Sequence, residues 1–209
     1  MIKHKIVDLF AGVGGLSYGF SQLDEFEIIM ANEIEKDISI AYSLNHPDVN
    51  MINCDINDLT EEMIKEFHKI LKEGTSDSRK EWFNVGEYKK LANQAGNMQT
   101  SLPKNVAKDM AKLMEWYNSL EKITIKEIIE FHFRFERIHP FQDGNGRVGR
   151  IIAFKECLKN NIVPFIILDK DKLFYYRGLK EYKNEKGFLI DTCLNAQDQY
   201  INMVEYYLK

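Results

Sequence analysis

The sequence has few cysteines and no strong excess of charge of either sign. Cys54, Cys157 and Cys193 are the only cysteines among the 209 residues, and no two of them form a CxxC pair. This spacing predicts neither a zinc site nor a disulfide framework and is typical of a reducing compartment. The net charge of −4 argues against nucleic acid as a partner, because DNA affinity comes largely from lysine and arginine neutralising phosphates, and we find no basic patch.

Long apolar runs and targeting signals are also absent. No segment approaches the roughly 20 apolar residues of a membrane-spanning helix, and the amino end has neither the apolar stretch nor the cleavage site of a signal peptide. We therefore expect a cytoplasmic protein that does not contact a membrane. A composition of 44% hydrophobic and 29% charged residues is typical of a globular protein, and the length allows one large core or a small domain with a fragment attached.

The amino-terminal quarter of the chain has the pattern of a parallel α/β sheet. Residues 6–10 are an apolar run typical of a buried strand, and the glycine-rich turn at residues 11–15 leads into a helix. Two further apolar runs follow at residues 27–31 and 50–53. This order of elements predicts the opening of a parallel, Rossmann-like sheet.

From about Leu59 onwards the pattern is mainly α-helical. Thr60 is placed to cap a helix that Gly74 ends. The polar stretch 75–102, with extended pieces around 82–85, predicts a β-hairpin flap. Four more helices are predicted: from Pro103 through Tyr117, from a Thr124–Glu127 capping box toward Ile138, from the glycines after Asp143 through Leu158, and over much of 189–208.

Residues 139–150, with the sequence HPFQDGNGRVGR, join two of the predicted helices through a loop rich in residue types used in phosphate chemistry. Gly144 and Gly146 allow backbone N–H groups to approach an anion closely at the amino end of the following helix. Asp143 is placed to hold Mg²⁺, which prefers one or two carboxylates together with phosphate oxygens. The loop is therefore predicted to bind a phosphate group and its metal ion.

The two ends of the same segment supply a base and two cations. Arg147 and Arg150 lie one helical turn apart and can clamp the same phosphates, while a neutral imidazole at His139 is suited to take a proton from an attacking hydroxyl. Each feature alone has a structural alternative, because terminal histidines, glycine turns and surface arginines are common in proteins. Their combination within one short segment favours a catalytic site.

This segment resembles the Fic family motif HxFx(D/E)GNGRxxR at every specified position. The resemblance implies a Fic-type helical core with a β-hairpin flap over residues 58–209, and transfer of AMP from Mg-ATP to a Ser, Thr or Tyr hydroxyl of a target protein. Residues 82–102 would align the target by strand-like pairing. By this likeness His139 deprotonates the hydroxyl, Asp143 binds Mg²⁺, Gly144, Asn145 and Gly146 hold the ATP phosphates, and Arg147 and Arg150 neutralise the departing diphosphate.

The segment DLFAGVGGLS, from Asp8 to Ser17, resembles the first motif of DNA cytosine-5 methyltransferases, which holds S-adenosylmethionine. Asn32-Glu33 and Cys54-Asp55-Ile56 follow the second and third predicted strands, where that family contacts ribose and adenine. The likeness ends near residue 57, before the Pro-Cys nucleophile of the family, so we expect no methyl transfer. The residues that this resemblance implies as a remnant cofactor site are Asp8, Phe10, Gly12, Gly14, Glu33 and Asp55.

Two domains are thus expected: a truncated methyltransferase-like fragment at 1–57 and a Fic domain at 58–209. A sheet of three strands leaves an exposed edge, so the fragment packs on the helical domain, forms a homodimer, or is a remnant of a gene fusion. The alternative function is a binding module, in which the fragment still binds S-adenosylmethionine or a restriction-modification partner.

The sequence lacks a clear inhibitory motif for this site. Many Fic proteins carry an inhibitory helix with the pattern (S/T)xxxE(G/N), whose glutamate pairs with the second motif arginine. Ser21 and Glu25 are the only pair with this spacing, and Phe26 stands where Gly or Asn is required. We therefore expect Arg150 to lack an intramolecular partner, and the enzyme to be constitutively active or restrained by a separate antitoxin protein.

Overall fold

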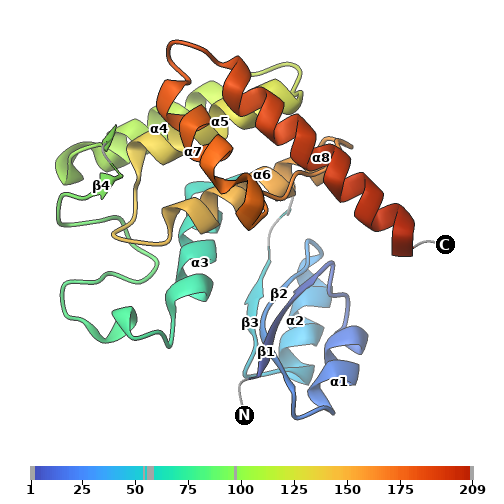
Figure 1. The fold of residues 1–209 in the computed structure, drawn as a ribbon. Coiled ribbons are helices and arrows are strands. Elements are labelled where there is room, and N and C mark those ends of the chain that lie inside the picture. Colours follow the sequence, from blue (N-terminus) through green and yellow to red (C-terminus); the bar gives the residue numbers. More distant parts are fainter. Residues whose placement is uncertain (1–2, 54, 56–58, 97, 208–209) are drawn as a thin grey trace. The chain divides into compact units, whose positions relative to one another are not determined.

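The computed structural model describes residues 3–53, 55, 59–96 and 98–207. The chain divides into two compact units, residues 1–59 and residues 60–209 (Figure 1). The predicted boundary between residues 57 and 58 lies outside the described residues.

The amino-terminal unit is a small parallel α/β sheet. The sheet has the order β1-β2-β3 with parallel pairing throughout, which confirms the predicted Rossmann-like opening. Ser17 and Tyr42, one on each helix, are buried at the sheet, and the Tyr42 hydroxyl lies 2.6 Å from the Ser17 hydroxyl. The elements are β1 (His4–Leu9), α1 (Gly15–Ser21), β2 (Phe26–Asn32), α2 (Lys36–Asn45) and β3 (Asn50–Ile52).

The carboxyl-terminal unit is helical. Its first helix is capped by Thr60, whose hydroxyl accepts the Met63 N–H at 3.2 Å, and the capping box of Thr124 and Glu127 is present, as predicted. None of the helices among the described residues is long and apolar enough to span a membrane. The helices are α3 (Glu61–Lys72), α4 (Pro103–Asn118), α5 (Ile125–Ile138), α6 (Asn145–Lys159), α7 (Lys172–Glu181) and α8 (Gly187–Tyr207).

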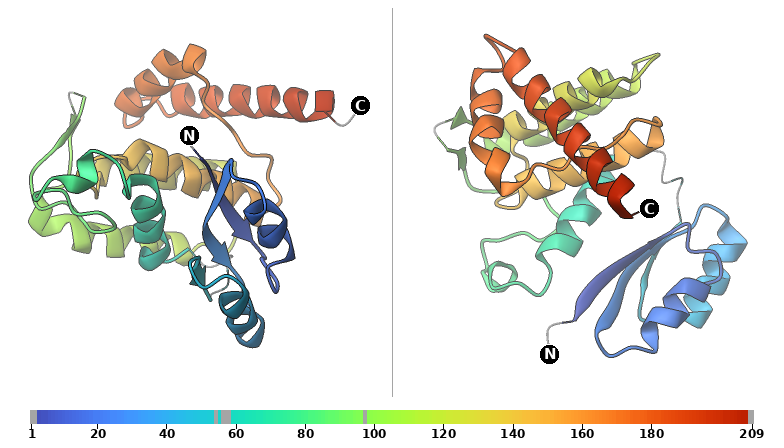
Figure 2. Two further views of the ribbon diagram at one scale, coloured as in Figure 1. Left: turned by 90° about the horizontal axis from the view of Figure 1, so that it is seen from below. Right: turned by 45° about the vertical axis from the view of Figure 1, so that its right-hand side comes forward.

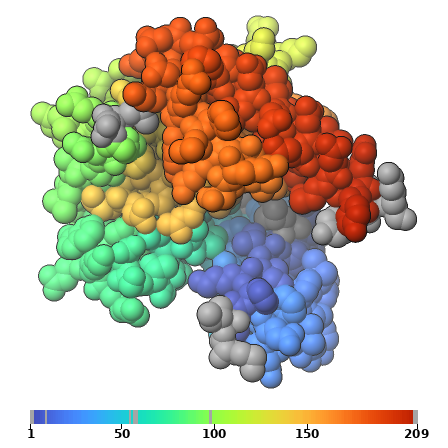
Figure 3. Space-filling view, viewed as in Figure 1, coloured from blue at the N-terminus to red at the C-terminus, as the bar shows by residue number. Residues whose placement is uncertain are grey.

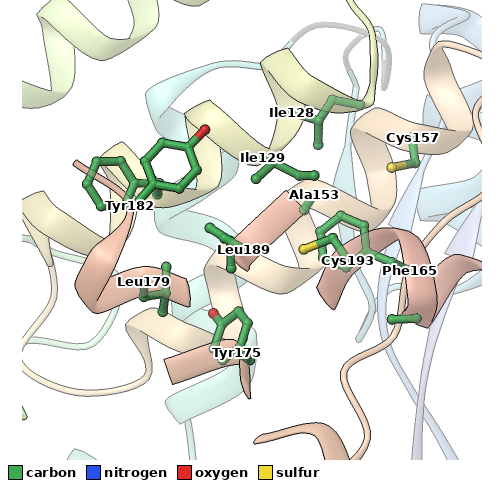
Figure 4. Packing of buried hydrophobic residues seen from close by; sticks show 12 residues of the cluster. Ile128, Ile129, Ala153, Cys157, Phe165, Tyr175, Leu179, Tyr182, Leu189 and Cys193 are labelled. Atoms are coloured by element: carbon green, nitrogen blue, oxygen red, sulfur yellow. The ribbon is translucent and has the colours of Figure 1, made fainter. Parts of the chain in front are cut away.

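Helix α5 is the centre of this unit and packs against α4, α6 and α8. One buried cluster joins α5 to α6, α7 and α8, and its aromatic members include Phe133 stacked on Tyr182 with ring centroids 4.3 Å apart (Figure 4). Burial of this apolar surface stabilises the unit at about 25 cal/mol per Å² removed from water. The cluster therefore fixes the two helices, α5 and α6, between which the motif loop lies.

Helix α7 was not predicted from the sequence. Leu173, Phe174 and Tyr176 are exposed on it, while Tyr175 is buried, so apolar residues surround the helix and give no clear helical stripe. A Cβ at Gly178 would lie 2.7 Å from the Leu189 Cα, and this close approach packs α7 onto α8. Figure 2 shows that α8 extends well beyond α7, and Figure 3 shows the two helices forming one continuous surface.

The flap contains a hairpin, but not where extended structure was predicted. Residues 82–85 lie in and between two turns and form no strand, and the paired strands are β4 (Gln94–Ala95) and β5 (Met98–Gln99), which are antiparallel. The reason is that Phe83 is buried beside α3, with its ring 6.0 Å from the ring of His68. The apolar residues near position 83 anchor a turn and do not form a strand.

Candidate active site

The motif loop joins the carboxyl end of α5 to the amino end of α6. Its first residue, His139, caps α5 with φ 52° and ψ 60°, a left-handed conformation that is uncommon for residues other than glycine. At the other end Gly144 caps α6 with φ 84°. Backbone strain at a residue with a reactive side chain is frequent at functional sites, so the geometry supports a functional role for this loop.

The His139 imidazole is largely buried and oriented from one side. Its Nδ1 lies 3.3 Å from the backbone oxygen of Glu136 and 3.7 Å from the Oε2 of the same residue. Burial lowers the pKa of His139, and the positive charge of Lys89 acts in the same direction, so the ring is neutral at pH 7. A neutral ring engaged through Nδ1 leaves Nε2 to accept a proton.

The buried side chains of the loop hold its shape. The ring of Phe141 stacks on that of His68, with centroids 4.0 Å apart and an interplanar angle of 1°. Asn145 accepts the Phe141 N–H and donates to the Phe141 carbonyl, both at 2.8 Å. The Asn145 side chain is thus engaged within the loop, so its contact with an anion can come only from its backbone N–H.

Asp143 lies beside two cations. Its Oδ2 accepts from Lys72 Nζ at 2.7 Å and from an Arg147 nitrogen at 3.3 Å. Partial burial raises the pKa of Asp143, but the hydrogen bond from Lys72 and the charges of both cations outweigh it, so the pKa is below its usual value. Lys72 is itself only 3% exposed and also pairs with Asp77 at 2.8 Å. Lys72 was missed as a site residue, because in the sequence it is only a lysine in the last turn of a helix.

The amino end of α6 combines unpaired backbone N–H groups with the positive end of the helix dipole. Gly144 and Gly146 are required for close packing there. A Cβ at Gly144 would lie 3.2 Å from Leu71, and a Cβ at Gly146 would lie 3.2 Å from Arg150 Nη1. A helix end of this kind binds phosphate through its backbone.

The two motif arginines have different environments. Arg147 is half exposed and pairs with Asp143. Arg150 lies over the ring of Tyr175, 5.9 Å from its centroid, and its charge acts on the buried carboxyl of Glu136. Arg150 thus has neighbours on α7 and α5, but neither of them is a glutamate of an inhibitory (S/T)xxxE(G/N) helix, so the expected absence of such a partner stays a prediction.

His68 of α3 connects the flap to the motif loop and was missed as a site residue. Its Nδ1 accepts the Gly86 N–H at 3.0 Å, so its Nε2 carries the proton and donates to the Asp143 carbonyl at 3.1 Å. Burial lowers the pKa of His68 to about 4. This neutral ring forms a hydrogen bond through each of its nitrogens and so connects the motif loop to the flap.

Lys89 makes a second connection from the flap. Its backbone N–H donates to the Pro140 carbonyl at 2.8 Å, and its Nζ donates to Asn93, Thr100 and the Ile138 carbonyl at 2.6, 3.0 and 3.3 Å. Burial lowers the pKa of Lys89 to about 8. Only the folded structure brings this amine near His139.

In the amino-terminal unit the carboxylates of the predicted cofactor site already accept hydrogen bonds from the protein. Glu33 accepts the Glu35 N–H at 3.1 Å and the Gly12 N–H at 2.9 Å, and these hydrogen bonds hold the pKa of Glu33 below its usual value. Asp8 is buried and accepts the Ser17 hydroxyl at 2.6 Å. The structure thus brings Gly12 and Glu33 together, with both carboxylate oxygens of Glu33 already accepting backbone N–H groups.

The remaining residues of that predicted site surround the glycine turn. Phe10 is 70% exposed, and Gly14 caps α1 with φ 94°. A Cβ at Gly14 would lie 2.4 Å from His46 Nε2, so only glycine fits there. Asp55 is partly buried after β3, whereas Cys54 and Ile56 lie outside the described residues.

Comparison with protein families gives two matches. The Fic/DOC family matches residues 58–156, and the C-5 cytosine-specific DNA methylase family matches residues 4–75. The chain therefore carries a Fic/DOC family domain preceded by a methylase-like segment, which confirms both resemblances. The methylase match extends past residue 57 into α3, a helix of the carboxyl-terminal unit.

Individual proteins match each half of the chain. The probable protein adenylyltransferase of Aquifex aeolicus is 37% identical over 100 residues, which cover 46% of this chain and 31% of that protein. A type II methyltransferase of Neisseria gonorrhoeae is 44% identical over 62 residues, which cover 30% of this chain and 18% of that protein. The chain thus spans less than a third of the length of these two relatives.

The fold is shared with a solved structure. A Fic domain-containing signaling protein from Bacteroides thetaiotaomicron superposes with a TM-score of 0.53 and 26% identity, and the alignment covers 70% of this chain and 57% of that chain. This similarity confirms the predicted Fic-type helical core.

Proposed function

We propose that this chain is a protein adenylyltransferase that transfers AMP from ATP to a Ser, Thr or Tyr hydroxyl of a target protein. The proposal rests on a neutral histidine, His139, at the end of α5 and on two arginines, Arg147 and Arg150, in the first turns of α6, the helix that follows the glycine turn. The similarity to a protein named as an adenylyltransferase supports the same reaction.

In the proposed reaction the target hydroxyl oxygen attacks the α-phosphorus of ATP while Nε2 of His139 takes the hydroxyl proton. A bond forms between that oxygen and the α-phosphorus, and the bond from the α-phosphorus to the oxygen bridging to the β-phosphate breaks. The products are an adenylylated protein and diphosphate. Arg147 and Arg150 stabilise the charge that develops on the diphosphate.

Asp143 is the residue proposed to hold Mg²⁺. No cluster of three or more acidic, histidine or cysteine side chains occurs in the part of the chain that the structure describes. A single ionised carboxylate nevertheless fits this ion, which is commonly held by one or two carboxylates plus phosphate oxygens and water. When bound, Mg²⁺ would neutralise phosphate charge. Because Lys72 and Arg147 both contact Asp143 Oδ2, metal binding competes with these ion pairs.

The backbone N–H groups of Gly144, Asn145 and Gly146 are proposed to hold the ATP phosphates, and the flap at 82–102 to align the target segment. The hairpin of β4 and β5 supports the second assignment, since a short antiparallel pair can add a strand.

We assign residues 1–57 to a methyltransferase-like fragment and 58–209 to a Fic domain that acts in the cytoplasm, under the control of a separate antitoxin or of none. S-adenosylmethionine binding is the competing function of the fragment. Because both Glu33 oxygens already accept backbone N–H groups, a ribose would have to share them. Isothermal calorimetry with S-adenosylmethionine tests this alternative, and we expect no heat of binding.

The test of the main proposal is incubation of the purified chain with Mg²⁺, bacterial lysate and ATP labelled on the α-phosphate. We expect label on protein and, by mass spectrometry, the mass of one adenylyl group on a hydroxyl side chain. ATP labelled on the γ-phosphate is the control and should leave protein unlabelled. Label from the γ-phosphate would instead indicate a kinase and contradict the proposal.

A further inference from the structure

A buried carboxyl group lies directly behind the motif loop. Glu136 is on α5, one turn before His139, and is 6% exposed. Its Oε1 has no hydrogen-bond partner among the described residues. A buried polar atom without a hydrogen-bond partner destabilises a fold. Such an atom is therefore a candidate for a functional role.

The carboxyl group of Glu136 lies between the base and one of the motif arginines. Its Oε2 is 3.7 Å from Nδ1 of His139. A Cβ at Gly146 would lie 3.6 Å from its Oε1 and 3.2 Å from Nη1 of Arg150. Glycine at position 146 therefore lets the carboxyl group and the guanidinium approach the same point.

Other elements also face this carboxyl group. A Cβ at Gly149 would lie 3.1 Å from Glu136 Oε1 and 3.0 Å from Nδ1 of His132, and His132 Nε2 lies 2.6 Å from the Tyr175 hydroxyl. Burial lowers the pKa of His132 to about 4, and Arg150 lowers it further in the same direction. The groups facing Glu136 are thus two neutral rings and a phenol, from α5 and α7, and one cation, Arg150 of α6.

We propose that the carboxylate of Glu136 is a positioning residue that favours the charged form of His139 across an ion-pair distance, while the backbone oxygen of Glu136 engages Nδ1 and leaves Nε2 free to take the proton of the target hydroxyl. The catalytic part of this inference rests on the proposed function. Their separation of 3.7 Å is an ion-pair distance longer than a hydrogen bond. When His139 becomes an imidazolium, the attraction to the carboxylate strengthens and stabilises the charged ring.

In this role, the ionisation of Glu136 changes the pKa of His139. Burial raises the pKa of Glu136 to about 7, although the charge of Arg150 opposes the shift. Below that pH the protonated carboxyl no longer stabilises the imidazolium, so transfer should fall as the pH drops through about 7. Lys89 and Asp143 also act on the pKa of His139. Lys89, with a pKa of about 8, loses its charge above the window near pH 7, and Asp143 stays ionised throughout it.

The experiment is a titration of the His139 ring by NMR in the full chain without nucleotide, with His139→Ala used to assign its signal. Glu136→Gln keeps the shape of the side chain and removes its charge. We expect the pKa of His139 to fall by about 1 in this variant, and the pH profile of AMP transfer to lose its decrease near pH 7. The matched control is Glu156→Gln, because Glu156 is equally buried but bonds to Tyr117 and Lys155.

An unchanged pKa of His139 in Glu136→Gln would overturn the proposal. If that variant does not fold, the titration of the wild-type protein decides. A nearby carboxylate that acts on His139 gives the curve of its NMR chemical shift against pH a second inflection near the pKa of Glu136. A curve with a single inflection contradicts the proposal. The titration uses no ATP. A protein that shows the expected titration but transfers no AMP would contradict the proposed function and leave this inference standing.

Discussion

Both units of the chain have a glycine turn before a helix, but the side chains around the two turns differ. Gly14 begins α1 with φ 94° and Gly144 begins α6 with φ 84°, so each unit has a glycine in the left-handed conformation at a helix start. Next to Gly144, Asp143 pairs with Lys72 and Arg147, and the side chains of His68 and Leu71 pack against the glycine. Around Gly14 the ring of His46 packs against the turn, and the acid Glu33 bonds to the backbone of the turn.

This difference shows that a glycine turn at a helix start is not by itself a catalytic site. The proposed reactive groups of the carboxyl-terminal unit lie at the end of α5, in the motif loop and on α6, and a cluster of a dozen buried residues holds α5 and α6 together. Among the described residues of the amino-terminal unit, Ala11, Ala31 and Tyr42 form a smaller buried cluster. A larger core can hold strained and charged residues against their tendency to relax.

The largest effect on activity is expected for His139, the proposed general base in the carboxyl-terminal unit. His139→Ala should lower AMP transfer at least about 100-fold, because general base catalysis contributes roughly that factor or more. Labelled ATP measures the rate, and circular dichroism checks that the fold is retained. His4→Ala, which removes an exposed histidine of the amino-terminal unit, is the control. Equal transfer by the His139 variant and the wild type would show that His139 is not the base, and that the two units do not differ in the way proposed.

The next effect separates two carboxylates that share one partner. Asp143 and Asp77 both accept from Lys72 Nζ, at 2.7 and 2.8 Å, but only Asp143 belongs to the motif. Asp143→Asn should lower Mg²⁺-dependent transfer roughly 10- to 100-fold, and Asp77→Asn should leave it near the wild-type rate. The dependence of the rate on Mg²⁺ concentration measures both. Similar losses in the two variants would mean that Lys72, and not a metal ion, explains the role of Asp143.

A third effect concerns stability against pH. Burial lowers the pKa values of His68 and His132 to about 4, so their stabilisation is complete above pH 6.5 and is lost as the pH falls toward 4. Each histidine should account for on the order of 3 kcal/mol over this window. The raised pKa of Glu136 has the opposite sign, because its contribution is lost as the pH rises through about 7.

Fluorescence can assign that loss to one unit. The chain has two tryptophans, Trp82 and Trp116, and both belong to the carboxyl-terminal unit. Urea unfolding followed by fluorescence at pH 7 and pH 4.5 should show the loss, and His132→Gln should reduce it. An unfolding free energy that fluorescence finds equal at the two pH values would contradict the assignment.

The smallest effect is expected for the one inhibitor-like pair of the sequence. Glu25→Gly should change self-modification with ATP and Mg²⁺ by less than about twofold, because Phe26 replaces the required Gly or Asn and the helical pattern is absent: residues 22–25 form a turn before β2. The comparison is with wild type under the same conditions. A silent wild type that Glu25→Gly activates would make the amino-terminal unit an inhibitor of the other.

Features that depend on neighbours along the chain could be predicted from the sequence alone. The motif at residues 139–150, the capping box at Thr124 and the strand–turn–helix order after His4 all depend on neighbours in the chain, and each could be identified from residue type and spacing. The Fic-type fold followed from the same motif. The roles of the motif residues remain predictions.

The contacts of the motif loop with distant residues could not be predicted in this way, because they depend on how the chain folds. Lys72 meets Asp143 from 71 residues away, and His68 meets the same residue from 75 residues away, contacts that no local pattern encodes. Helix α7 and the turn around Phe83 were missed for a related reason, since packing against α8 and α3 overrides their local patterns. Burial and long-range pairing act on positions brought together by folding, so the pKa values of His139 and Glu136 are properties of the folded unit.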